Sequence, residues 1–372
     1  MKSDTKTISF RCDSGTLSDS LGVAFRASPS KAALAAPAGV LVCAEETGRL
    51  VLSATDGELT IETSLPAEVS IPGEVVLHRI FGDIIRSLPE GAVEILVDGD
   101  GIATVSSGRS HFSLRTYQRE DFPVLPKITE EFTEISSPGL CQKIEQTVIA
   151  ASSDKSRPVL TGVLLQKTEK GTRLVATDSY RLVVNEIEQQ DLLGDEKQIL
   201  LSARALAEVA RLSQGESDAI GMVISTQKIS FRVGTTTVTT GFIEGNFPNY
   251  EQLIPDQMEN RLEIEKTAFL DALRRVGLLA RDSTPVRLLL SEDLVRLQAI
   301  DPELGGEADE EVEGIYTGEE MTIAFNPGFL RDGFEACEAD KILIEMTAPL
   351  KPAVISEHAS RSFMYLLMPV RV

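Results

Sequence analysis

One short phrase occurs three times along the chain, and its spacing limits the architecture more than any other feature. An aspartate ends an apolar run and precedes a second run at Asp56, Asp178 and Asp301. These residues lie 122 and 123 positions apart in a chain of 372 residues. A single core rarely grows past about 250–300 residues, so three similar units also suit the length of the chain.

The segments around this phrase predict the same order of elements in each unit. An amphipathic segment and an apolar strand precede the phrase, and a second helix follows it. The second helices are expected to begin at Pro72, at Ser202 and at Asn326. Alternating strands close each unit. The chain is therefore predicted to be α+β, with three repeats that each contain two helices and antiparallel sheets.

Two proline-bearing segments separate the units. They are DFPVLPKITEE at 121–131 and NFPNYEQLIPDQ at 246–257. The predicted domains are 1–126, 127–256 and 257–372. The second connector is open to two interpretations, a plain linker or a wall of a binding site.

The charge is distributed unevenly. The formal net charge is −21, and a surface this acidic repels nucleic acid at long range. Six segments are expected to be helical: 16–27, 73–88, 138–157, 202–213, 266–281 and 327–338. Together they carry +3, so the remainder carries −24. Helices that line a groove or ring would hold a phosphate backbone, whereas the alternative is that their Lys and Arg simply face solvent.

No residues stand at the spacing that a metal centre requires. The histidines, His78, His111 and His358, have no partner at ligand spacing, and no phosphate-binding or nucleophile motif opens a helix. No cofactor and no metal are expected. The cysteines form no C-x-x-C pair, and the N-terminus lacks the apolar core of a signal peptide. A cytoplasmic protein with free thiols is predicted.

The acidic residues allow a catalytic and a structural interpretation. The repeated aspartates could be catalytic carboxylates, or turn formers whose side chains accept hydrogen bonds from the backbone two residues on. The turn is favoured, because a residue that folding needs recurs in every unit. The acidic run 307–313 lacks the order of a calcium-binding loop and is expected to be a solvated loop.

Five segments, in order and at matching spacing, resemble the β sliding clamp family, the β subunit of bacterial DNA polymerase III. They are SGRSHFSL (107–114), ATDSYRL (176–182), EGNFPNYEQLIP (244–255), AFNPGFL (324–330) and YLLMPVRV (365–372). The resemblance covers essentially the whole chain. It implies a head-to-tail homodimer whose six domains form a ring around double-stranded DNA, with helices lining the hole and sheets outside.

The resemblance implies a processivity factor without catalytic activity of its own. An ATP-driven clamp loader would open the ring. The polymerase III alpha subunit, the loader, other polymerases and repair factors would bind one apolar pocket between the second and third domains, in which methionine adapts to varied ligands. Carried over by motif, the pocket residues are Leu160, Thr177, Ser179, Tyr180, Arg181, Leu182, Pro248, Leu253, Asn326, Phe329, Leu350, Leu366, Leu367, Met368, Pro369, Val370 and Arg371.

Two further residue sets follow from the resemblance. The positions that match DNA contacts are Lys31, Arg157, Arg204 and Arg211, with Lys155 and Arg281 as weaker matches. At the dimer interface, Phe112 and Leu114 of one chain are expected to meet Leu278 and Leu279 of its partner, near the acidic run 307–313.

Four residues depart from the family pattern. Asp154 stands where relatives carry an uncharged polar residue, and Pro158 and Val159 stand where some carry aromatics. Gln252 replaces a basic residue of the pocket. Weaker DNA contacts by the loop around Asp154 and different peptide affinities are therefore expected.

Two other functions stay open on the residues alone. A multi-domain scaffold or ligand-binding protein without DNA would fit the charge of −21, and it predicts a monomer. An enzyme with a carboxylate site on the repeated aspartates predicts that Asp178→Asn abolishes an activity without unfolding the chain.

Overall fold

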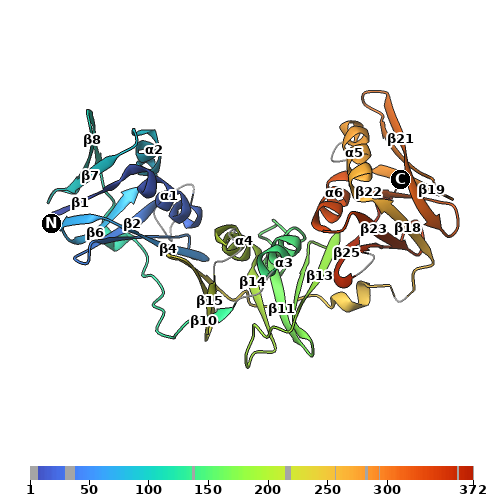
Figure 1. The fold of residues 1–372 in the computed structure, drawn as a ribbon, viewed down its shortest axis with the longest axis horizontal. Coiled ribbons are helices and arrows are strands. Elements are labelled where there is room, and N and C mark those ends of the chain that lie inside the picture. Colours follow the sequence, from blue (N-terminus) through green and yellow to red (C-terminus); the bar gives the residue numbers. More distant parts are fainter. Residues whose placement is uncertain are drawn as a thin grey trace. The chain divides into compact units, whose positions relative to one another are not determined.

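The protein, known here from a computed structural model, forms two compact units. Residues 1–136 with 211–242 form the first unit, and residues 137–210 with 243–372 form the second. The described residues are all except 1–6, 30–37, 136–138, 214–218, 256, 281–283, 293, 358–359 and 372, and except the side chains of 360 and 361. Figure 1 shows α-helices on one side of the strands in each part of the chain.

The first unit contains two antiparallel sheets. Their strand orders are β5-β1-β7-β8-β9 and β10-β15-β16-β17-β4-β3-β2-β6. The strands are β1 (Ile8–Asp13), β2 (Gly39–Glu45), β3 (Arg49–Thr55), β4 (Leu59–Pro66), β5 (Glu68–Ile71), β6 (Gly73–His78), β7 (Ala92–Val97), β8 (Ile102–Ser107), β9 (Ser110–Arg115), β10 (Thr133–Ile135), β15 (Ile220–Ser225), β16 (Lys228–Val233) and β17 (Thr236–Gly241). The helices are α1 (Ser14–Ala24) and α2 (Ile80–Ser87), with short 3-10 helices η1 (Phe25–Ala27) and η2 (Arg119–Asp121).

The second unit is built on one sheet of twelve strands. Its order is β14-β11-β12-β13-β25-β24-β23-β18-β21-β20-β19-β22. The strands are β11 (Gly162–Thr168), β12 (Gly171–Thr177), β13 (Arg181–Glu188), β14 (Gln198–Ser202), β18 (Asn260–Glu265), β19 (Val286–Ser291), β20 (Leu294–Asp301), β21 (Gly306–Thr317), β22 (Met321–Phe325), β23 (Lys341–Met346), β24 (Ala353–Glu357) and β25 (Ser360–Leu367). The helices are α3 (Leu140–Val148), α4 (Ala203–Leu212), which begins in this unit, α5 (Lys266–Val276) and α6 (Pro327–Ala336), with η3 (Pro158–Thr161), η4 (Tyr250–Leu253) and η5 (Gly277–Leu279).

Local sequence signals account for two of the helices. Helix α6 begins where the Asn326 side chain accepts the N–H of Phe329 at 3.1 Å, with Pro327 in its first turn, as predicted. Helix α1 buries Leu17 and Leu21, which recur on one face at helical spacing. In the described part of the chain, none of the helices is both long and apolar enough to span a bilayer.

One backbone hydrogen bond recurs in each repeat and shows their common plan. The segment that closes each repeat donates an N–H to the edge strand of a sheet: Tyr117 to Val76 O (2.9 Å, β6), Ile243 to Leu200 O (2.9 Å, β14) and Val370 to Ala324 O (2.8 Å, β22). The predicted α+β class and the three repeats are confirmed.

Strand pairing joins the repeats edge to edge at two places. The first junction, in the first unit, consists of β4, β17 and the segment 117–129, and Ile61 faces Val238 in its register. The second junction, in the second unit, consists of β13, β25 and the segment 243–255, and Leu182 faces Leu366. Each junction continues a sheet from one repeat into the next.

Two helices are shorter than predicted. Residues 73–78 form strand β6, because the apolar run at 75–77 pairs with β2, so the helix starts at Ile80 rather than at Pro72. Helix α3 ends at Val148. Beyond it, the Asp154 side chain accepts the N–H of Ser156 at 2.9 Å, a local bond that competes with helix formation.

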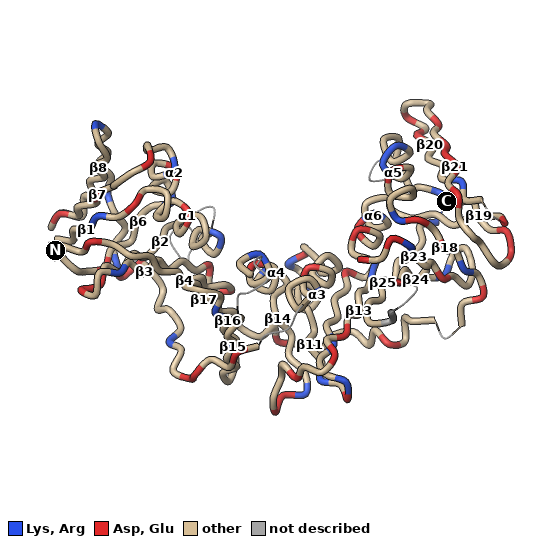
Figure 2. The backbone as a smooth tube through the Cα atoms, in the orientation of Figure 1, with Lys and Arg blue, Asp and Glu red and all other residues tan. Residues whose placement is uncertain are grey.

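The acidic run 307–313 is a strand rather than the expected loop. It belongs to β21, which pairs with β20 through residues 306–313 and buries Val312. Its carboxylates are partly neutralised, since Glu310 pairs with Arg275 at 2.9 Å and Glu311 pairs with Arg296. Figure 2 shows acidic positions along this hairpin and basic positions on α5.

Candidate functional site

The three repeated aspartates are turn formers, as predicted. Each Oδ1 accepts the backbone N–H groups two and three residues on: Asp56 from Glu58 and Leu59 (3.1 and 2.9 Å), Asp178 from Tyr180 and Arg181 (2.9 and 3.0 Å), and Asp301 from Glu303 and Leu304 (2.9 and 3.1 Å). This bonding explains their recurrence as a requirement of the turn between two strands.

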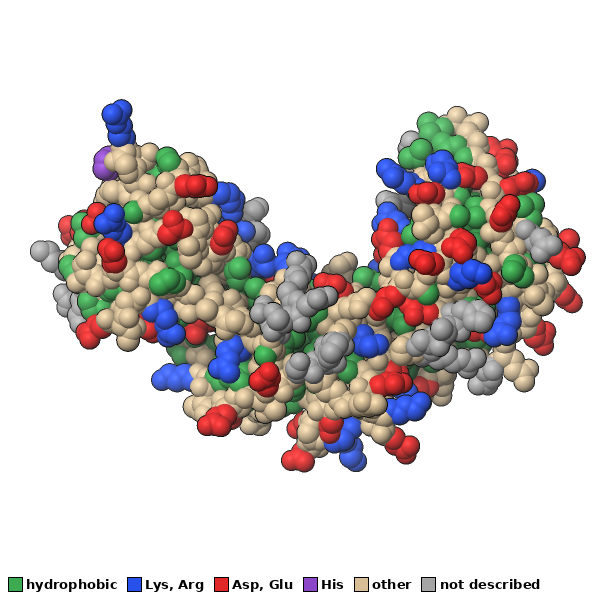
Figure 3. Space-filling model, viewed as in Figure 1, with side chains coloured by type: hydrophobic (Ala, Val, Ile, Leu, Met, Phe, Trp, Pro, Cys, Tyr) green, Lys and Arg blue, Asp and Glu red, His purple; other side chains and the backbone are tan. Residues whose placement is uncertain are grey.

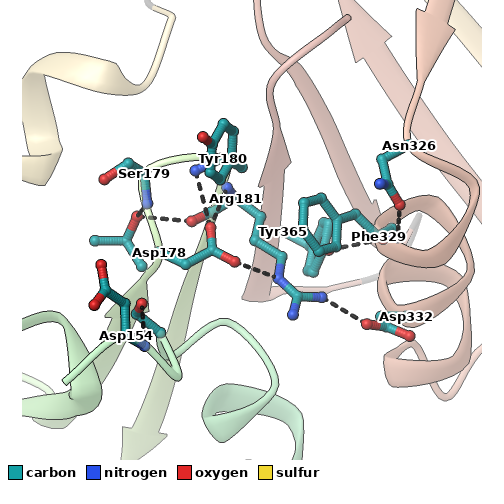
Figure 4. Close-up of polar contacts among 11 residues, drawn as sticks. Asp154, Asp178, Ser179, Tyr180, Arg181, Asn326, Phe329, Asp332 and Tyr365 are labelled. Atoms are coloured by element: carbon teal, nitrogen blue, oxygen red, sulfur yellow. Dashed lines mark hydrogen bonds and ion pairs between the residues drawn. The ribbon is translucent and has the colours of Figure 1, made fainter. Parts of the chain in front are cut away.

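The second of these turns also carries a largely buried ionic network, shown in Figure 4. Arg181 Nε lies 3.0 Å from Asp178 Oδ2, and its Nη1 lies 2.6 Å from Asp332 Oδ2. The guanidinium stacks over the Phe329 ring, 4.3 Å from the centroid. Only 11% of the Arg181 side chain is exposed, so this arginine is committed to joining the second repeat to α6 of the third.

Phe329 is held from three directions (Figure 4). The Asn326 side chain caps its N–H, and the Tyr365 hydroxyl donates to its carbonyl at 2.7 Å. Its ring stacks with that of Tyr180 at a centroid separation of 6.3 Å. Burial raises the pKa of the Tyr365 phenol well above its usual value, so the group stays a neutral donor.

The C-terminal segment is tied to this turn by its backbone. Met368 N–H donates to Tyr180 O at 2.9 Å, and Val370 N–H donates to Ala324 O at 2.8 Å. The side chains remain accessible, with 60% of Tyr180, 39% of Met368 and 38% of Val370 exposed. Exposed apolar side chains on a well-bonded backbone are typical of a surface that binds a partner.

The segment 243–255 forms the other side of this surface. Leu253 is 46% exposed and Pro248 is exposed. Beneath the segment lies one apolar cluster, in which Phe247 and Ile254 pack on Leu164, Val175, Leu182, Val184, Leu200, Tyr250, Val354 and Leu366. The 17 residues predicted for the pocket are called the docking surface below.

All members of the docking surface lie in the second unit, but they differ in exposure. Leu160, Thr177, Leu182, Leu366 and Leu367 are buried and support the surface from below. Arg181, Asn326, Phe329 and Pro369 are half-buried, and Ser179, Tyr180, Pro248, Leu253, Leu350, Met368, Val370 and Arg371 are exposed. Their role in binding a peptide stays a prediction.

Of the residues predicted to contact DNA, Arg157 has the most defined surroundings. Its Nε lies 3.0 Å from Asp154 Oδ2, and its Nη1 donates to Ser179 Oγ at 3.3 Å. Hydrogen bonds from Ser156, then from Arg157, lower the pKa of Asp154. Arg157 therefore connects the loop after α3 to the turn of the docking surface. Lys155, Arg204 and Arg211 are exposed, and Lys31 and Arg281 fall outside the described residues.

The residues predicted for the dimer interface lie on two different elements. Phe112 and Leu114 are on β9, an edge strand, and Phe112 is 37% exposed. Leu278 and Leu279 are in η5, and Leu278 is 79% exposed. Figure 3 shows apolar side chains gathered at the tip of the third repeat, near α5 and the β20–β21 hairpin of Figure 1. A single chain does not test their pairing, which stays a prediction.

Sequence reasoning missed two residues that support the docking surface. Asp332 lies 151 positions from its partner Arg181, and Tyr365 is a fully buried residue of β25. The AFNPGFL segment ends two residues before Asp332, so Asp332 lies close to a motif that carries the resemblance. Nothing in the sequence indicated Arg181 as its partner. Within the described ranges, no three His, Cys, Asp or Glu side chains are placed to hold a metal ion.

Known proteins match this chain over almost its whole length. Three family models match in order: DNA polymerase III beta subunit N-terminal domain at 8–126, central domain at 134–249 and C-terminal domain at 251–371. The beta sliding clamp of Streptomyces coelicolor is 33% identical, covering 97% of this chain and 99% of that protein. That of Synechococcus elongatus is 31% identical, covering 97% and 98%.

Solved structures share the fold. A sliding clamp of Bartonella birtlesii, solved with griselimycin bound, has a TM-score of 0.89 at 27% identity and covers 98% of this chain and 100% of that one. The clamp of Bacillus subtilis has a TM-score of 0.88 at 25% identity, with coverage of 99% and 100%.

Proposed function

Because this chain belongs to the bacterial beta sliding clamp family, we propose that it is a processivity factor that encircles DNA. Two copies would join head to tail through β9 of one and η5 of the other, and the three domains of each, 1–126, 127–256 and 257–372, would form half of the ring. The observation that carries the proposal is the match of three family domains in order over residues 8–371. The role requires no catalytic residue and places the protein in the cytoplasm at replication forks.

The docking surface would bind the polymerase III alpha subunit, the clamp loader and other polymerases and repair factors. Its exposed apolar side chains, such as Tyr180, Leu253 and Met368, supply a surface for apolar peptide anchors. Clamps of Bartonella birtlesii and Pseudomonas aeruginosa were solved with griselimycin bound. We expect griselimycin to compete with the alpha subunit for this surface.

Contacts with DNA would go to phosphates and carry no sequence information. Arg204 and Arg211 are exposed on α4, and Lys155 is exposed in the loop after α3. Replacing one phosphate-binding arginine by alanine should make the negative slope of log affinity against log salt less steep by about 0.9. Such weak contacts suit a ring that stays on DNA by topology.

The decisive experiment separates a topological link from ordinary affinity. The protein is loaded with its clamp loader and ATP onto nicked circular DNA, half the sample is linearised, and both halves are gel-filtered in high salt. Retention on circles with loss from linear DNA is the expected result. The Streptomyces coelicolor clamp with its own loader is the control. If that control is retained and this chain is lost equally from both forms, encirclement is wrong.

A further inference from the structure

One buried side chain anchors the segment that carries Leu253 and Pro248. Tyr250 is 4% exposed, whereas its neighbours Asn249 and Glu251 are exposed. Its ring belongs to the apolar cluster beneath the segment and meets Phe247 edge to face at 6.4 Å. The segment is otherwise short of regular structure, with one short 3-10 helix, so the side chains of Phe247, Tyr250 and Ile254 that pack on the cluster hold it in place.

The hydroxyl of Tyr250 meets a row of polar side chains on three adjacent strands. Gln166 on β11 faces Arg173 on β12, and Arg173 faces Glu186 on β13. The hydroxyl donates to Gln166 Oε1 at 2.8 Å and accepts from Arg173 Nη1 at 3.0 Å. Arg173 Nε is held in turn by Glu186 Oε1 at 2.6 Å. A row fixed by strand register is a rigid support for one phenol.

The surroundings of the Tyr250 hydroxyl keep it protonated. Burial raises the pKa of Tyr250, and the Arg173 guanidinium offsets part of that rise. The side chain of Glu186 is 17% exposed and that of Arg173 is 27% exposed, so their ion pair is partly shielded from water. The tyrosine therefore remains neutral and makes one donated and one accepted hydrogen bond.

We infer that Tyr250, held by the row Gln166, Arg173 and Glu186, positions the segment 247–254 as one wall of the docking surface and so sets its affinity for partners. The inference rests on the proposed docking function. Tyr250 is a positioning residue that acts through the wall, because it is buried while Leu253 is exposed. Loss of its hydroxyl leaves the ring in the cluster and the Arg173–Glu251 ion pair (3.5 Å) in place, but it removes both hydrogen bonds between the buried phenol and the polar row.

The test compares Tyr250→Phe with Tyr316→Phe. Tyr316 is also buried, but its hydroxyl donates to Glu319 O, with Asn260 Oδ1 3.3 Å away, and not to the segment. Binding to the immobilised alpha subunit is measured by surface plasmon resonance, and amide exchange of 247–254 is measured without partner. We expect Tyr250→Phe to weaken binding about three- to tenfold and to speed exchange in 247–254, and Tyr316→Phe to do neither.

A double-mutant cycle with Leu253→Ala distinguishes positioning from general weakening. If Tyr250 acts through the wall, Tyr250→Phe should change affinity less than twofold once Leu253 is truncated. Additive losses, or unchanged binding and exchange in Tyr250→Phe, would overturn the positioning role alone. If the unaltered chain fails to bind the alpha subunit, the docking proposal and this inference both fail.

Discussion

The two junctions have the same backbone plan but present different side chains beneath their connecting segments. At the first junction, Phe122 and Leu125 of the segment pack on Leu41 and Val76, but the face that β4 and β17 turn to the segment is polar: Thr60, Glu62, Thr237 and Thr239 line a groove of about 530 Å³ with residues of 124–129 and Arg119. At the second it is apolar, with Leu182, Val184, Met364 and Leu366 in one cluster. Strand pairing alone therefore makes a junction, and the two junctions differ in the side chains that their paired strands present on one face.

The three aspartate turns also differ in their side chains. The residue three positions after the repeated aspartate is Leu59 in the first repeat and Leu304 in the third. In the second repeat it is Arg181, which reaches Asp332 of α6. The network that joins Arg181 to Asp178 and Asp332 thus depends on an arginine that the equivalent positions of the other two turns lack.

The largest expected effect comes from removing this arginine. Arg181→Met would leave Asp178 and Asp332 without their buried partner, and we expect a loss of about 3–5 kcal/mol in the free energy of unfolding. Leu59→Met at the equivalent turn should cost less than about 1.5 kcal/mol, because the volume is conserved. Urea denaturation of both variants checks this. Equal losses would mean that the ionic network adds nothing specific to the second repeat.

Truncation of the docking surface should next affect partner binding. Leu253→Ala removes an exposed apolar side chain and should raise the Kd for the alpha subunit at least about tenfold. The matched control is Val124→Ala in the first junction, a residue that is 92% exposed. Surface plasmon resonance measures both. If the control weakens binding as much as Leu253→Ala does, the apolar contrast between the junctions does not decide binding.

A buried hydroxyl pair should make a smaller contribution to the first junction. Thr63 Oγ1 and Thr236 Oγ1 lie 2.8 Å apart, and both residues are buried. Thr63→Val should cost about 1 kcal/mol or more by leaving a hydroxyl unpaired, and Thr63→Val with Thr236→Val should recover most of that loss. Chemical denaturation measures both. A double variant less stable than the single one would contradict this account.

The smallest expected effect is a pH dependence in the first unit. His78 stacks on Tyr117 at a centroid separation of 3.7 Å, and burial lowers the pKa of His78. The unfolded chain then binds the proton first, so stability should fall as the pH drops below about 6.5 and level off below the folded pKa. Thermal unfolding at pH 7.5 and 5.5 should show a smaller fall in His78→Phe. An equal fall would exclude His78 as its source.

Features set by neighbouring residues were predictable from the sequence. The aspartate turns and the cap of α6 depend on side chains that bond the backbone two or three positions away. The prediction of a helix over 73–88 was wrong for residues 73–78, because pairing with β2 outweighed the local pattern there. Strand β21 was missed for a similar reason, since its acidic side chains are offset by arginines on α5 and β20.

The sequence by itself determined the three repeats, the α+β class, the family resemblance and the identity of the candidate surface residues. Only the tertiary structure decided that Arg181 meets Asp332 and that Tyr250 rests on Gln166 and Arg173. These contacts join residues 77 to 151 positions apart. Such pairs depend on the register of strands across a whole sheet, which many distant residues set together, whereas a turn or a cap needs only its own few residues.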